Sequence, residues 1–122
     1  MTGDRGETTR DAPVWGVESN DGKIVVRLGG ELDLYNAHVV REALAQASEE
    51  RPTRVVVDLS EVEFIDSTAL GVLIEARSRL ENRRAFLLAA PRAEARRALE
   101  VSGLDRHFGV YASVDEALDA SL

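Results

Sequence analysis

The stretch that decides the fold is VVVDLSEVEFIDSTALGVLI, residues 55–74. With the preceding arginine it opens on RVVVDLS (54–60), a nearly continuous apolar run of strand length. Such a run, buried on both faces, is typical of a central strand. From Asp66 or Ser67 onward, apolar residues follow helical spacing instead, along a stripe of Ala69, Leu73, Ala76 and Leu80 that Leu70 and Ile74 widen. The stretch therefore predicts a buried strand, a polar turn and a helix.

Two strands and a helix are predicted upstream of this stretch. Residues 14–17 and KIVVRLGG (23–30) predict a β-hairpin, because β-branched residues flank the turn sequence SNDG. We expect the glycine pair to end the second strand and ELDLYN (31–36) to follow as a loop. Asn36 is a candidate N-cap for a helix. The apolar stripe of that helix consists of Val39, Val40, Ala43, Leu44 and Ala47.

Downstream, the same alternation of strands and helices continues. AFLLAA (85–90) predicts a buried strand, and a helix over about residues 92–102 ends at Gly103 as a left-handed C-cap. HFGVYA (107–112) predicts a short last strand. A capping box, Ser113-x-x-Glu116, opens a terminal helix.

The predicted order is β-β-α-β-α-β-α-β-α in a single domain over residues 13–122. Residues 1–12 are polar and are expected to form a disordered tail. Strands that alternate with helices imply an α/β fold with a mixed, mostly parallel sheet of four to five strands and about four helices. In such sheets functional residues collect in loops at the carboxyl ends of strands. GGELDLYN (29–36) and EVEFIDST (61–68) are the two loops of that kind.

Composition excludes several classes of function. The net charge is −7, which disfavours nucleic acid as a partner, because phosphate backbones bind clustered basic faces. Acidic residues interrupt the local arginine groups, so the arginines are expected to be solvated. The chain has no cysteine, no run of 18 apolar residues and no apolar segment near its N-terminus. We expect a cytoplasmic protein that does not insert into membranes.

The sequence gives little support for a catalytic function. Ser67 lies on a strand-to-helix turn, but I-D-S-T-A lacks the small flanking residues of a nucleophile elbow. His38 and His107 are the available bases; His38 is expected to be solvated in the first turn of a helix, and His107 is expected to lie at an edge just before the last strand. The sequence contains neither a metal-ligand cluster of His and Cys nor a phosphate-binding loop motif. We expect no enzymatic activity and no bound cofactor.

From the residues alone, Ser67 is either a plain N-cap of the helix or a residue with a function of its own. A plain N-cap would stabilise the helix by about 1 kcal/mol. However, Gly71 within the helix costs about 1 kcal/mol relative to Ala, so something is expected to approach its backbone closely. Residues 69–74 are also apolar on nearly all sides, more than one buried face requires. The residues alone still favour the plain N-cap, but these two features weaken that interpretation and suggest that part of the surface is buried against another protein.

Three stretches together resemble the STAS family of anti-sigma factor antagonists. They are GELDLYNA (30–37), VVVDLSEVEFIDSTALGVLI (55–74) and LEVSGLDRHFGVYASVDEAL (99–118). The resemblance extends over about residues 14–120. One departure is Ala69, where the family often has Gly after the hydroxyl pair.

The resemblance implies a partner-switching protein. It implies that the anti-sigma factor, a serine kinase that brings its own ATP and magnesium, phosphorylates Ser67, with Thr68 as the secondary candidate. Asp33 and Asp66 would flank the acceptor, and a phosphatase would reverse the mark. The unphosphorylated form would bind the kinase and free a sigma factor, as a monomer or weak dimer. The implied partner-binding residues are Glu31, Asp33, Thr68, Leu70, Gly71 and Ile74. The family also offers an alternative, a constitutive accessory subunit of a lipid-transporting ABC complex.

Overall fold

The computed structural model describes residues 12–122, so the tail expected at the N-terminus lies almost wholly outside the described residues. Within them the predicted order of strands and helices is confirmed, with two short 3-10 helices added at Arg83–Ala85 and Leu104–Arg106. The strands are β1 (Val14–Asn20), β2 (Lys23–Leu32), β3 (Arg54–Ile65), β4 (Phe86–Ala89) and β5 (Gly109–Tyr111). The α-helices are α2 (Ala37–Glu49), α3 (Ser67–Arg79), α4 (Ala93–Ser102) and α5 (Val114–Asp119).

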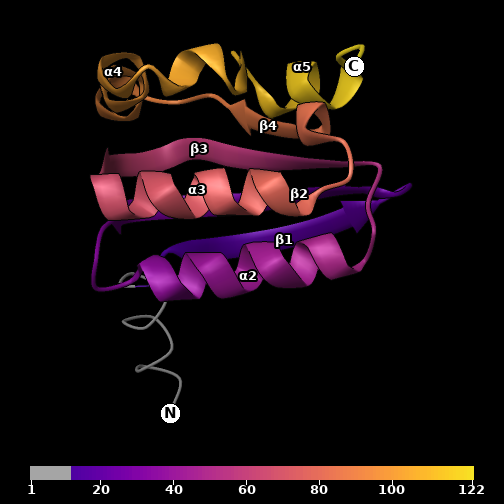
Figure 1. Cartoon of the computed structure of the whole chain (residues 1–122), viewed down its shortest axis with the longest axis horizontal. Helices are drawn as coiled ribbons and strands as arrows, with labels where there is room; N and C mark the ends of the chain where they lie inside the picture. The colour runs from indigo at the N-terminus through magenta and orange to yellow at the C-terminus, as the bar shows by residue number, and fades with distance from the viewer. Residues whose placement is uncertain (1–11) are drawn as a thin grey trace.

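The five strands form one mixed sheet in the order β1-β2-β3-β4-β5. β1 pairs antiparallel with β2, and the other neighbours are parallel, which confirms the predicted sheet. Helices α2 and α3 lie side by side against one face, as Figure 1 shows. They share the main hydrophobic core with α4, whereas α5 packs with a smaller cluster around Val56, Leu87 and Ala89. Strand β3 is covered on both faces, as its apolar run predicts.

The hairpin turn, the end of α4 and the start of α5 have the local structure that their sequences predict. Asp21 and Gly22 have φ angles of 57° and 80°, the left-handed pair that a tight two-residue hairpin requires. Gly103 caps α4 with a φ of 79°. The Ser113 side chain accepts a hydrogen bond from the Glu116 backbone N–H at 3.1 Å, so α5 begins as predicted.

The predicted end of β2 at the glycine pair is wrong. The strand continues to Leu32, and its register with β3 shifts on either side of Gly29–Gly30. Gly29 is required because the indole ring of Trp15 lies on it, and a Cβ there would be 2.2 Å from Trp15 Cε2. Gly30 has a φ of 75°, which favours glycine. The pair therefore bends the strand without ending it.

Strand β3 also runs past its predicted end at residue 60, to Ile65. The reason is that the longer β2 supplies a partner along the whole length, up to the pair Leu32↔Ile65. The two central strands consequently end at the same level of the sheet. Their following loops begin side by side, at the left of Figure 1.

Substitution of Gly29 by Ala, which adds a methyl group, tests the contact between Gly29 and the Trp15 ring. Gly29→Ala should lower the free energy of unfolding by about 1–3 kcal/mol, because the bulky ring must move to admit the Cβ. Trp15 is the only tryptophan, and its indole N–H donates to the Ala12 carbonyl at 2.9 Å, so its fluorescence should change as well. Gly71→Ala is the control, since no described atom beyond the backbone of its own helix and its chain neighbours lies within 4 Å of the added Cβ, and it should stabilise by up to about 1 kcal/mol. Equal unfolding midpoints for Gly29→Ala and wild type would contradict the contact.

Candidate functional site

The candidate site lies at the edge of the sheet where β2 and β3 end. The backbone N–H of Asp66 donates to the Leu32 carbonyl at 3.0 Å, which continues the ladder by one bond beyond the last strand residues. This bond brings the loop of residues 33–36 against the turn between β3 and α3. The two loops expected to carry function therefore meet.

The carboxylate of Asp66 joins these loops. Its Oδ1 accepts from the backbone N–H of Ala69 at 2.9 Å, and its Oδ2 accepts from that of Leu34 at 3.1 Å. Asp66 has an extended backbone, φ −100° and ψ 178°, as an N-cap residue requires. One side chain thus caps α3 and holds the neighbouring loop.

The expectation that Ser67 caps the helix is wrong. Ser67 is the first residue of α3, and the cap is Asp66. Aspartate and serine are equally good caps, and the carboxylate has a second oxygen with which to bind Leu34. Ser67 and Thr68 are both exposed, and among the described residues no hydrogen bond to the Ser67 hydroxyl is formed. The hydroxyl is therefore available to another molecule.

Residues 33–36 are held by their own polar side chains. The Asp33 carboxylate accepts from the Tyr35 backbone N–H at 3.0 Å. Asn36 stands at the N-cap position of α2 but makes no capping bond, contrary to the prediction. Its side chain instead accepts from the Asp33 N–H at 2.9 Å and donates to the Glu31 carbonyl at 2.8 Å. Asp33 therefore contributes charge beside the site, and its carboxylate bonds within its own loop.

The exposed apolar surface of α3 is smaller than the sequence predicts. Leu70 is only 8% exposed and belongs to the core, so the structure contradicts its placement on this surface. Ile74 is 44% exposed. Gly71 is exposed, and no other part of the chain comes within 4 Å of a Cβ built there. The close approach expected at Gly71 therefore does not come from the described part of this chain.

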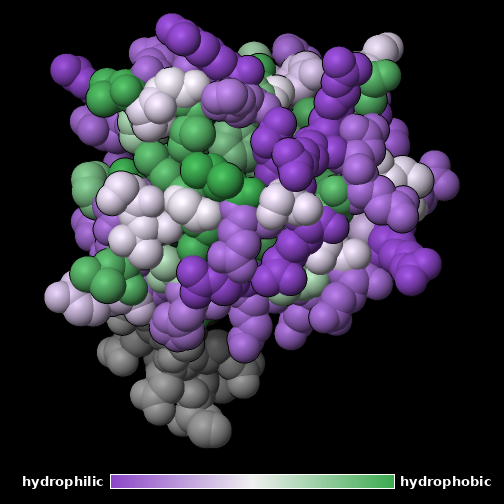
Figure 2. Space-filling model, in the orientation of Figure 1, coloured by the Kyte–Doolittle hydropathy of each residue, from purple (hydrophilic) through white to green (hydrophobic). Residues whose placement is uncertain are grey.

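Three exposed hydrophobic residues beside the site were missed. Leu34 is 63% exposed, Tyr35 83% and Phe64 46%. Figure 2 shows hydrophobic side chains gathered in the upper left of this face, above α3 and toward α4, with smaller separate patches along the left edge. A signal was present in the sequence, because two large apolar residues stand between Asp33 and Asn36 in a loop that should be polar.

The two segments that form the site carry charge of one sign. Neither residues 29–36 nor residues 61–71 contain Lys or Arg, and their acidic residues are Glu31, Asp33, Glu61, Glu63 and Asp66. In residues 12–122 no group of three or more His, Asp or Glu side chains is arranged to hold a metal ion. The edge combines an exposed hydroxyl, exposed apolar side chains and a negative surround, an arrangement suited to binding a protein.

Comparison with known proteins identifies the family. The sequence model of the STAS domain matches residues 15–117. The anti-sigma-F factor antagonist RsfB of Mycobacterium tuberculosis is 32% identical over 102 residues, which cover 84% of each chain. The chain therefore belongs to the STAS-domain family of anti-sigma factor antagonists.

Solved structures agree with this assignment. An anti-sigma factor antagonist from Mycobacterium paratuberculosis superposes with a TM-score of 0.79 at 34% identity, over 84% of this chain and 88% of that one. SpoIIAA in its unphosphorylated form gives 0.72 at 25% identity, covering 85% and 91%. The phosphorylated form of the Bacillus protein gives 0.65 at 25% identity, covering 85% and 96%.

The helices of the described residues include none that is long and apolar enough to span a bilayer.

Separate substitutions of Asp66 and Ser67 test which of the two residues caps α3. Asp66→Ala should lower the free energy of unfolding by about 1–2 kcal/mol, since two backbone N–H groups lose their acceptor. Ser67→Ala should stay within about 0.5 kcal/mol of wild type. Asp66→Asn should lie between them, because an amide offers a single acceptor oxygen. Urea unfolding followed by circular dichroism measures all three, and an equal loss for Ser67→Ala and Asp66→Ala would contradict the assignment.

Proposed function

We propose that this protein is an anti-sigma factor antagonist whose binding is switched by phosphorylation of Ser67. Unphosphorylated, it binds an anti-sigma factor and so frees a sigma factor. That anti-sigma factor is a serine kinase that supplies its own ATP and Mg²⁺, and a phosphatase removes the mark. The protein itself is a non-enzymatic regulator that acts as a monomer or weak dimer.

The exposed hydroxyl of Ser67 is the observation that carries this proposal. A kinase must reach the acceptor oxygen without unfolding the substrate. Ser67 meets this condition because Asp66 already supplies the cap and leaves the hydroxyl with no structural bond. Thr68, the secondary candidate, is exposed next to it on the first turn of α3.

The position of Ser67 also explains how a phosphate could release a partner and leave the fold intact. A phosphate adds about −1.5 to −2 charges. At a helix N-terminus the dipole and free N–H groups stabilise such a charge. A partner packed over Gly71 and Ile74 would instead have to bury it beside Asp66 and Asp33. A 100-fold loss of affinity requires only about 2.7 kcal/mol, which one buried unpaired charge readily supplies.

The relatives support both parts of the proposal. RsfB is named for antagonism of an anti-sigma factor, and SpoIIAA is known in phosphorylated and unphosphorylated forms.

The exposed side chains of Leu34, Tyr35, Phe64 and Ile74 give a binding surface its apolar centre, and the acidic residues form its rim. We therefore infer that the anti-sigma factor presents apolar side chains within a basic rim.

Phosphorylation at Ser67 is tested with the cognate kinase. Incubation with the kinase, ATP and Mg²⁺ should label Ser67, and Ser67→Ala should abolish labelling, whereas Thr68→Ala should retain it. The phosphorylated protein should bind the kinase at least about 100-fold more weakly, with an unchanged circular dichroism spectrum. If binding were equal in both forms, the switch would be wrong and a constitutive subunit, such as that of a lipid-transporting ABC complex, would be favoured.

Gly71 provides an independent test of the binding surface. Gly71→Gln should raise stability slightly, since Gln is the better helix former and the site is open. It should weaken kinase binding by tenfold or more if the partner packs directly on this turn. Ser78→Gln, an exposed position near the other end of α3, is the control and should leave binding unchanged. Wild-type affinity for Gly71→Gln would move the interface away from α3.

A further inference from the structure

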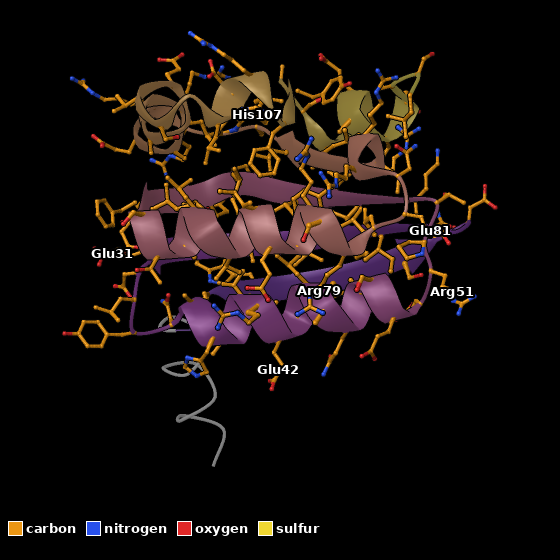
Figure 3. The ribbon with its side chains drawn as sticks, in the orientation of Figure 1. Glu31, Glu42, Arg51, Arg79, Glu81 and His107 are labelled. Carbon is orange, nitrogen blue, oxygen red and sulfur yellow. The ribbon has the colours of Figure 1, made fainter. Side chains whose placement is uncertain are left out.

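A pocket lies at the edge of the sheet opposite the candidate site, where β4 and β5 begin. Its volume is about 270 Å³, and its lining includes Leu87 and Gly109, which are near the starts of these strands. Its remaining walls come from α3, the 3-10 helix Arg83–Ala85, the segment before β5 and the last residues of the chain. The polar side chains that line it include Arg77, Arg83, Arg84, His107 and Tyr111. Figure 3 places His107 above α3 in the view, far from Glu31 at the left edge.

The pocket is basic in a protein of net charge −7. Three arginines and a histidine line it, together with no acidic side chain. Within residues 12–122 the ion pairs involve Arg27, Arg41 and Arg79, so the three pocket arginines have no carboxylate partner there. Glu81, their acidic neighbour in sequence, lines a different pocket. Arg83 and Arg84 are exposed, as expected, and they line this pocket together with Arg77 and His107.

Specific contacts hold the Arg77 side chain and the backbone of the segment that carries Arg83 and Arg84. The Asn82 side chain accepts from the Arg84 backbone N–H at 3.0 Å, which caps the 3-10 helix that carries Arg83 and Arg84. The guanidinium carbon of Arg77 lies 5.7 Å from the centre of the Phe108 ring, within cation–π range. Neither contact uses the guanidinium N–H groups, so these donors remain free for a ligand. Such preorganisation lowers the entropic cost of binding.

The other large pockets lack this combination. The pocket of about 610 Å³ near Arg51 contains Glu81, and its Arg79 is paired with Glu75 at 3.0 Å. The third pocket contains Glu18, Asp21 and Asp119 with a single lysine, Lys23, whose Nζ donates to the Leu118 carbonyl. Of these three pockets in residues 12–122, the one at the start of β4 and β5 is lined by several cations that form no ion pair there.

We propose that this pocket binds a phosphate group, either as a free inorganic phosphate compound or as the terminal phosphates of a nucleotide. Planar guanidinium groups donate paired hydrogen bonds to phosphate oxygens, and a histidine and a tyrosine hydroxyl add further donors. Three arginines match an anion with several charges better than one with a single charge. Pyrophosphate and triphosphate groups are accordingly the expected ligands.

The test is titration of the full ¹⁵N-labelled chain with inorganic phosphate, pyrophosphate, tripolyphosphate and ATP. Tripolyphosphate should bind more tightly than phosphate, with saturable shifts at the amides of Arg84, His107 and Gly109 and none at Ser67. Equal affinities for tripolyphosphate and ATP would show that the phosphates alone are held, whereas tighter binding of ATP would identify a nucleotide site. No kinase is present, so the result is independent of the proposed switch at Ser67.

Paired double substitutions complete the test. Arg83→Gln with Arg84→Gln should weaken tripolyphosphate binding at least tenfold, because it removes two charged donors from the pocket. Arg96→Gln with Arg97→Gln changes the net charge equally at exposed positions on α4 outside the pocket, and should leave affinity within about twofold. Equal losses in both variants would overturn the proposal, as would shifts that fail to saturate in the millimolar range.

Discussion

The carboxylate of Asp66 is the interaction on which the candidate site depends. Both of its oxygens are used, one for the first turn of α3 and the other for the loop after β2. Because these two segments lie 32 residues apart, no local preference could hold them together. The same bonds determine the role of Ser67, since a helix that is already capped leaves the next side chain without a structural task. Structure and reactivity are thus divided between adjacent residues.

This division is physically useful for a switch. If Ser67 were the cap, its modification would remove a helix-stabilising bond, and binding and folding would change together. With Asp66 as the cap, the fold does not depend on the Ser67 oxygen, which is the proposed site of modification. A phosphate there would find the positive end of the α3 dipole on one side and acidic residues on the other. The helix limits the cost to the fold, so most of the electrostatic cost would fall on a bound partner.

The order of strands and helices could be predicted because each is specified locally. The apolar run of β3, the stripe of α3 and the caps at Gly103 and Ser113 all follow from neighbouring residues. The predictions that are wrong concern places where contacts between distant segments determine the local structure. The glycine pair would end an isolated strand, but Trp15 packs on Gly29 and β3 supplies pairing beyond it. Similarly, Asp66 and Ser67 are equal candidates as a cap until Leu34 supplies the second hydrogen-bond donor.

The two edges of the sheet carry opposite charge, which the net charge of the chain conceals. The segments that form the site at Ser67 contain acidic residues and neither Lys nor Arg, whereas the pocket at the other edge is lined by three arginines without an ion pair in residues 12–122. Helix α3 connects these regions, with Ser67 at its start and Arg77 near its end, ten residues and about 15 Å further along. That separation exceeds the Debye length of about 8 Å at physiological salt, so charges at the two edges scarcely act on each other through solvent. Any coupling between a phosphate at Ser67 and an anion at Arg77 must therefore pass through displacement of α3 against the sheet. The buried residues Ala69, Val72, Leu73 and Ala76 resist such a displacement, which favours two sites that work independently.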